Sequence, residues 1–158
     1  FAQQAYACSP TQSGLFHPDE NKAASYDDPV TGYSQKLPVL IVKEIEVIRG
    51  SGSDGFSCDD AGFLIVKMEI PQDSSYSFDD FGVYFRVVSG EDILAGHAYP
   101  LRPISKKGKV ATFQTVWLDR DPSSQKALDV VIESFVISHT LQLGSAMKFD
   151  VKAAVGKK

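Results

Sequence analysis

The sequence is poor in the residues on which most functional assignments depend. Its 158 residues include two cysteines, three histidines and one tryptophan, and 20 acidic residues outnumber 16 lysines and arginines, which gives a formal net charge of -4. Such a chain has no basic field that would collect phosphates, so we expect no nucleic-acid partner. The histidines, His17, His97 and His139, have none of the spacings of a metal site, and we expect them at the surface or at strand ends.

Long apolar runs and catalytic motifs are also lacking. Even the run LPVLIV at 37–42 is followed at once by Lys43 and Glu44, whereas a membrane-spanning helix needs about 20 apolar residues. We therefore expect no transmembrane segment. The loop GSGSDG at 50–55 lacks the strand-to-helix context of a nucleophile elbow. We accordingly expect no catalytic residue, no metal and no cofactor, and a protein that is not an enzyme.

The two cysteines, Cys8 and Cys58, bear on the cellular compartment. The first residues, FAQQAYA, are similar to the cleavage region of a secretory signal, so we expect a bacterial protein exported to the periplasm or the cell exterior. An even number of cysteines in an exported chain favours one disulfide, Cys8–Cys58. It would close a loop of about 50 residues and stabilise the fold by about 4 kcal/mol. Two alternatives stay open, namely a lipid attached at Cys8, which the small Ala7 precedes, and two free thiols.

Hydrophobic periodicity predicts an all-β fold. Residues 1–36 are polar and have no period, whereas short apolar runs separated by turn residues begin at Leu37. We expect an extended N-terminal arm over 1–36 and an antiparallel two-sheet β-sandwich over 37–158. The predicted strands lie within 37–50, 62–71, 81–90, 109–119, 127–140 and 147–155, with a seventh, short edge strand around Tyr99.

Period-two alternation also assigns the faces of these strands. The residues expected to face the core are Val39, Ile41, Ile45 and Val47 in the first strand and Leu64, Val66, Met68 and Ile70 in the second. Segment 81–90 is apolar on both faces except at Arg86, which predicts a central strand. Segment 127–140 has partly helical spacing, but its Val, Ile, Phe, Ser and Thr content favours a strand.

Four stretches carry a resemblance to a known class of domain. They are CDDAGFLIVKMEIP, FGVYFRVVSG, TVWLDRDP and MKFDVKA, within the span Leu37 to Ala154. Their order resembles bacterial secreted immunoglobulin-like and fibronectin type III-like β-sandwich domains. The resemblance implies a sandwich of about seven strands. It implies no particular function, because such sandwiches serve adhesion, scaffolding, sugar binding and enzyme accessory roles alike.

Aromatic side chains provide one candidate binding site. Tyr76, Phe78 and Phe81 fall in or beside the loop SSYSFDDFG, and Tyr99 lies in a proline-rich loop. Exposed aromatic rings on a sandwich loop could stack on sugar rings or contact a protein partner. The alternative, which we favour, is that these rings fill the end of the sandwich. Trp117 is expected in the core.

Paired aspartates provide a second candidate site. Asp59–Asp60 and Asp79–Asp80 fall in predicted loops, and loops gathered at one end of a sandwich can supply the six to eight oxygens that calcium prefers. No calcium-loop motif is present, however, and aspartate is also an ordinary turn residue whose side chain accepts backbone hydrogen bonds. We therefore favour turn chemistry over a calcium site.

Together these observations predict a non-enzymatic exported β-sandwich protein that acts by binding or by structural association. Its partner would be a protein or a glycan, and the alternative function is a carbohydrate-binding or calcium-dependent adhesion module. The arm and the strand edges are the expected contact surfaces, because an extended segment can pair with an unprotected edge. The same surfaces would serve self-association.

Overall fold

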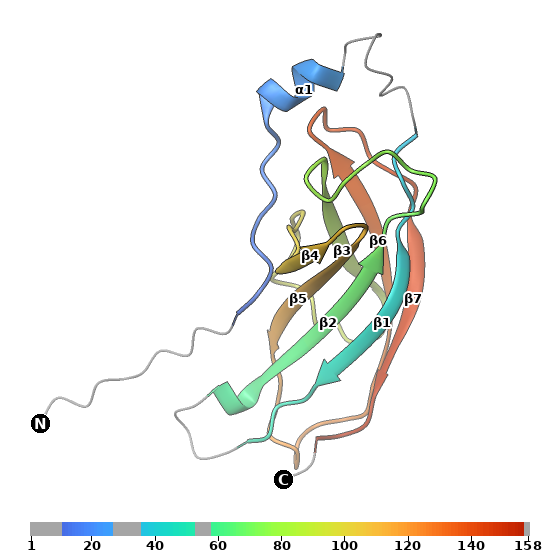
Figure 1. Cartoon of the computed structure of the whole chain (residues 1–158). Helices are drawn as coiled ribbons and strands as arrows, with labels where there is room; N and C mark the ends of the chain where they lie inside the picture. The colour runs from blue at the N-terminus through green and yellow to red at the C-terminus, as the bar shows by residue number, and fades with distance from the viewer. Residues whose placement is uncertain (1–10, 27–35, 53–57, 157–158) are drawn as a thin grey trace, which may run out of the picture.

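The protein is a β-sandwich of two antiparallel sheets packed face to face (Figure 1). The structure, a computed structural model, describes residues 11–26, 36–52 and 58–156. The elements are α1 (Glu20–Tyr26), β1 (Ile41–Ile48), the 3-10 turn η1 (Cys58–Asp60), β2 (Ala61–Glu69), β3 (Phe81–Ser89), β4 (Ser105–Lys107), β5 (Val110–Leu118), β6 (Leu128–Ser138) and β7 (Met147–Ala153). The predicted fold class is thus confirmed, and segment 127–140 forms a strand rather than a helix.

One sheet has the strand order β1-β2-β5-β4 and the other the order β3-β6-β7. The first, second, fifth and fourth strands thus form one sheet, and the third, sixth and seventh strands form the other. Topology describes only the fold, because sandwiches with this strand order carry unrelated functions.

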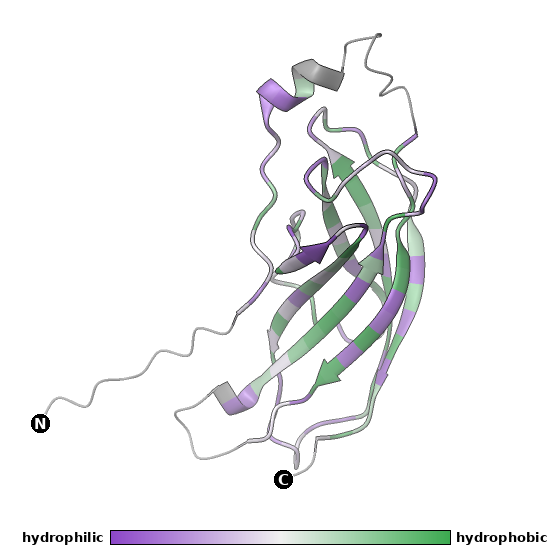
Figure 2. Cartoon of the chain, viewed as in Figure 1, coloured by the Kyte–Doolittle hydropathy of each residue, from purple (hydrophilic) through white to green (hydrophobic). Residues whose placement is uncertain are grey.

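The core lies between the sheets and follows the predicted alternation in most strands. In β2, Leu64, Val66 and Met68 are buried, as predicted, and so is Ile70 directly after the strand. Figure 2 shows the corresponding alternation of apolar and polar residues along β1 and β7. Trp117 packs against the core and covers Gly62 of the neighbouring strand, where a Cβ atom would come within 2.4 Å of the ring.

In β1 the predicted faces are wrong at the start of the strand. Val39 and Ile41 are exposed, whereas Leu40 is buried and Val42 packs against the core together with Ile45. The cause is a β-bulge between Val42 and Glu44, which shifts the pairing with β2 by one residue. Because side chains alternate with period two, one extra residue exchanges the faces of everything on its other side.

Two further predictions about strands are wrong. The short edge strand is at Ser105–Lys107 rather than around Tyr99. Segment 81–90 was expected in the centre of a sheet, but β3 ends the order of its sheet and β6 is central. The N-terminal half of β3 is buried on both faces for another reason, namely that Phe16 of the arm covers its outer face at Gly82.

The arm lies along one open side of the sandwich (Figure 1). Ser13 N–H donates to Gln114 O of β5 at 2.8 Å, and Arg102 N–H donates to Gly14 O at 2.8 Å. Leu101 in turn exchanges two backbone hydrogen bonds with Val83 of β3. Residues 13–16 and 100–102 therefore link the free edges of the two sheets on this side. On the opposite side, no backbone hydrogen bond joins β1 to β7 within the described ranges.

The arm is not extended throughout, because α1 begins where its sequence gives a capping signal. Asn21 N–H donates to Asp19 Oδ1 at 2.9 Å, and Ala23 N–H donates to Asp19 O at 2.8 Å. Asp19 thus caps the helix, a role for which aspartate is among the preferred residues. The short helix places Lys22 beside the domain.

Candidate functional site

A pocket of about 280 Å³ opens between the arm and β4, and we call it the arm–β4 pocket. Its lining comes from four separate parts of the chain: Phe16 and Lys22 of the arm, Phe78 and Asp79 before β3, Arg102 to Ile104, and Ser105 and Lys106 of β4. The walls are apolar, through two phenylalanines, a proline and an isoleucine. Three of the charged side chains at the rim are cationic and one is anionic.

His139 positions the arm wall of this pocket. Its Nδ1 accepts the N–H of Asp19 at 2.9 Å, and its Nε2 donates to Asp79 O at 2.9 Å. A nitrogen that accepts a backbone N–H carries no proton, so this geometry fixes His139 as the neutral tautomer with hydrogen on Nε2. The Phe16 ring packs against the imidazole with 4.8 Å between ring centroids. His139 therefore joins the arm to the loop that carries Asp79.

The electrostatics of the pocket are dominated by its cations. A hydrogen bond from Lys106 lowers the pKa of Asp79 below its ordinary value, and the charges of Lys106, Lys22 and Arg102 add to this effect against a smaller opposing contribution from burial. Asp79 and Lys106 also form an ion pair. Among the described lining residues, one carboxylate thus faces three cations.

Arg102 is the cation least used by the fold. Its backbone N–H bonds the arm, but the guanidinium donates no hydrogen bond within the described part of the chain. A guanidinium offers five N–H donors that match carboxylate or phosphate oxygens. The arrangement can therefore bind an anionic group whose apolar neighbour rests on the exposed side chain of Ile104.

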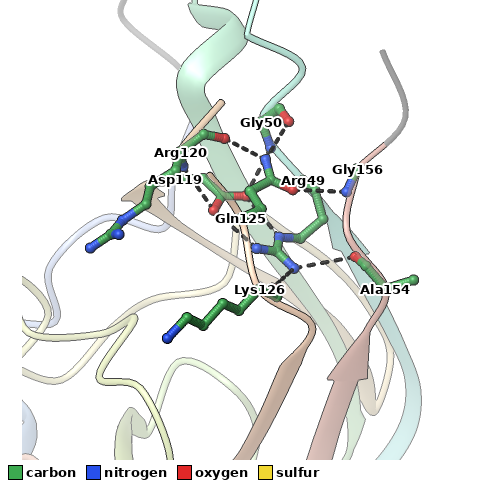
Figure 3. A network of polar contacts seen from close by, with 8 residues as sticks. All are labelled: Arg49, Gly50, Asp119, Arg120, Gln125, Lys126, Ala154 and Gly156. Atoms are coloured by element: carbon green, nitrogen blue, oxygen red, sulfur yellow. Dashed lines mark hydrogen bonds and ion pairs between the residues drawn. The ribbon is translucent and has the colours of Figure 1, made fainter. Parts of the chain in front are cut away.

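Figure 3 shows a second polar cluster, the Arg49–Asp119 cluster. It lies at the opposite end of the sandwich, because Asp119 follows the last residue of β5 whereas β4 pairs with the beginning of that strand. Arg49 donates two hydrogen bonds to the Asp119 carboxylate, at 2.8 and 3.2 Å, and both side chains are almost fully buried. Arg49 also donates to Lys126 O and Ala154 O. Gln125 donates to Gly50 O and accepts from Gly156 N–H.

This cluster is structural rather than a site for a ligand. Asp119 also accepts the N–H groups of Gly50 and Arg120, both at 2.9 Å. Burial acts to raise the pKa of Asp119, but the hydrogen bonds from Arg49, Gly50 and Arg120 and the Arg49 charge outweigh it and lower that pKa. Because each carboxylate oxygen is already bonded, the cluster ties the ends of β1, β5 and β7 together and offers no free group for chemistry.

The structure excludes the candidate aromatic site as an exposed platform. Tyr76, Phe78 and Phe81 are 5%, 3% and 1% exposed and belong to the core, where Phe81 contacts both of the other rings. They fill the end of the sandwich because the loop folds back over the gap between the sheets. Only Tyr99 of the predicted set is exposed, at 41%.

The candidate calcium aspartates do not come together. Asp59 and Asp60 precede β2, whereas Asp79 and Asp80 precede β3 beside the far end of β2, so the two pairs lie at opposite ends of the sandwich. Asp80 accepts the N–H of Ser77 at 2.6 Å, which is turn chemistry. Within residues 11–26, 36–52 and 58–156, no three His, Cys, Asp or Glu side chains form a group that could hold a metal ion.

The remaining predicted residues divide in two groups. His17 is exposed and His139 directly follows β6, as expected. His97 and His139 are buried, which was not expected, and each bonds a backbone carbonyl. Cys8 lies outside the described residues, and Cys58 is described only as part of η1. The Cys8–Cys58 disulfide and its alternatives therefore stay predictions.

The residues that sequence reasoning missed are Phe16, Lys22, Arg102 and Lys106. They lie together in the arm–β4 pocket, but no local sequence pattern indicates that they do.

Comparisons with protein-family models, with curated proteins and with solved structures find no match for this chain. In the described residues, no helix has the length and apolar character needed to cross a membrane.

Proposed function

We propose that this protein is an exported, non-enzymatic binding protein whose arm–β4 pocket takes an acidic side chain or a terminal carboxylate of a protein partner. The observation that carries the proposal is the Arg102 guanidinium, whose donors no described group uses, in a pocket that Lys106 and the exposed Ile104 also line. The charges of Lys22, Arg102 and Lys106 all act on Asp79, the one carboxylate among the described lining residues. An anionic group entering the pocket gains charge-assisted hydrogen bonds that the fold itself leaves unmade at Arg102.

A protein segment is favoured over a glycan for two reasons. Tyr76, Phe78 and Phe81 are buried and so are not available to stack on sugar rings. The pocket is also bordered by β4, an edge strand whose outer edge makes no backbone hydrogen bond in the described part of the chain. An extended peptide can hydrogen-bond such an edge while its side chains enter an adjacent pocket.

The proposal is tested by titrating the full chain with a tetraglutamate peptide in a calorimeter or by NMR. We expect binding that weakens as salt is added, because exposed charges are screened. Arg102→Gln should weaken binding by about tenfold, since it removes one charge and leaves the backbone pairing intact. Lys126→Gln, at the opposite end of the domain, is the matched control and should bind as the unmodified chain does.

Two results would contradict the proposal. If the peptide does not bind, or if Lys126→Gln weakens it as much as Arg102→Gln, the pocket is not the binding site. If a heparin tetrasaccharide binds more tightly than the peptide and depends on Arg102, the partner class is an acidic glycan instead.

A further inference from the structure

The free edge of β1 has a pattern that matches a second copy of itself. Its backbone bonds only β2 within the described ranges, because β1 begins the strand order of its sheet. The strand reads Ile41-Val42-Lys43-Glu44-Ile45-Glu46-Val47-Ile48. An unpaired edge of this length is a template for a further strand.

The β-bulge makes the strand nearly palindromic. Because Lys43 and Glu44 together oppose a single residue of a neighbouring strand, eight residues occupy seven positions centred on Ile45. In an antiparallel pair of two copies, Ile41 then lies opposite Ile48, and Val42 lies opposite Val47. Both isoleucines are on the outer face and both valines are on the core face. Without the bulge, Ile41 and Ile48 would point to opposite faces and could not pair.

Charge complementarity follows the same register. In this register, Glu46 of the second copy lies opposite the bulge, where Lys43 and Glu44 share one position. The side chains of all three residues are on the outer face of the sheet. Glu44 is already paired with Lys67 at 2.6 Å. Lys43 is 2.9 Å from Glu69 in its own chain and is half-exposed, so it can also contact a second carboxylate. Two-fold symmetry produces this contact twice.

Apolar exposure supports a second copy as the occupant. Ile41 and Ile48, the first and last residues of β1, are 47% and 44% exposed. Pairing through the two-fold axis would bury each isoleucine against the other at both ends of the interface. An isologous contact of this kind closes on itself and does not continue into fibres.

We propose that this protein forms a two-fold dimer by antiparallel pairing of β1 with β1 of a second copy, which joins two four-stranded sheets into one of eight strands. The interface is the sheet edge opposite β4, so it leaves the arm–β4 pocket accessible. The dimer does not depend on the anionic partner, and either proposal can fail without the other.

Sedimentation equilibrium of the full chain, from low micromolar to millimolar concentration, tests the dimer. We expect a concentration-dependent monomer–dimer equilibrium and a melting temperature that rises with concentration. Lys43→Glu should raise the dissociation constant by about tenfold, because Glu46 of the second copy then faces two carboxylates at each of the two bulge positions. Addition of Glu46→Lys to this variant places a cation opposite those carboxylates and should return the dissociation constant to within about threefold of the original.

The control is Lys107→Glu, which reverses an exposed lysine on β4, the opposite edge of the same sheet, and should leave dimerisation unchanged. Circular dichroism of each variant shows whether its fold is retained. A chain that stays monomeric at millimolar concentration would overturn the proposal. So would a dimer that Lys43→Glu does not weaken, or a double variant that associates no better than Lys43→Glu.

Discussion

The Phe16 ring of the arm lies directly on Gly82 of β3, in the space that a side chain would otherwise fill. A Cβ atom at position 82 would come within 2.5 Å of Phe16 Cγ. Phe16 is buried and also packs against His139. A single glycine in one sheet therefore permits the arm to form a wall of the pocket beside the other sheet.

Gly82→Ala should detach the arm. Since the ring and the backbone of β3 leave no room for a methyl group, we expect a loss of about 1–3 kcal/mol of stability and weaker binding of the tetraglutamate peptide. Hydrogen exchange of the amides of residues 14–19 measures arm docking directly. Gly96→Ala is the control, because a Cβ atom there would meet nothing within 4 Å. Unchanged protection of residues 14–19 in Gly82→Ala would contradict the dependence of the arm on this contact.

Removal of the Asp119 carboxylate should be among the most damaging single changes. Asp119→Asn leaves the Arg49 guanidinium buried without its anion, and loss of one partner of a buried pair costs about 3–5 kcal/mol. Asp129→Asn is the comparison, because the Asp129–Lys152 pair is exposed at 3.6 Å and should contribute less than about 1 kcal/mol. Urea unfolding of both variants at neutral pH measures the difference. Equal decreases in the free energy of unfolding of the two variants would show that burial of the Arg49–Asp119 pair adds nothing to its contribution.

The same carboxylate predicts a pH dependence. Its pKa is lower in the folded state than in the unfolded chain, where an aspartate has a value of about 3.9. Its stabilising contribution is therefore complete above the unfolded pKa and is lost as the pH falls through the folded one. Between neutral pH and about pH 5 the contribution is constant, and it decreases below about pH 4. In acid titrations of stability, Asp119→Asn should show a shallower decline than the unmodified chain.

The alternation of side chains predicted most of the fold because burial repeats every second residue in a regular strand. Leu64 to Ile70 follow it without interruption. The predicted alternation failed at Lys43, because the bulge there depends on the pairing with β2 and has no signal within the sequence of β1 itself. The α1 helix could have been predicted, since Asp19 before Glu20 and Lys22 is a capping signal.

The arm–β4 pocket was beyond prediction for a different reason. Phe16, Asp79 and Lys106 are far apart in sequence, and they meet only because residues 13–16 pair with residues 100–102. Local patterns contain no information about which loop lies beside which. The buried His139 was missed likewise, because its burial depends on the distant backbone groups of Asp19 and Asp79 that it bonds.

Lys109 should prove to be a structural lysine. Its Nζ donates to the carbonyl oxygens of Pro71 and Gln72, both at 3.0 Å, and of Ser74. Lys109→Met should therefore cost about 2 kcal/mol, because three carbonyls lose a charged donor. Lys107→Met, in the exposed strand on the other side of the same turn, should change stability by less than about 0.5 kcal/mol. Equal denaturant midpoints for the two variants would show that the three bonds contribute nothing.

Replacement of Thr115 should stabilise the fold, in contrast to the substitutions above. Its Oγ1 is the one buried side-chain oxygen or nitrogen in the described part of the chain without a hydrogen-bond partner, and the residue is 3% exposed. Thr115→Val replaces that hydroxyl by a methyl group of similar size on the core face of β5. We expect a gain of about 1 kcal/mol in the free energy of unfolding, because an unsatisfied hydroxyl no longer has to leave water. Thr112→Val, on the outer face of the same strand, should have little effect, since its hydroxyl is partly in contact with water. A loss of stability in Thr115→Val would contradict the prediction.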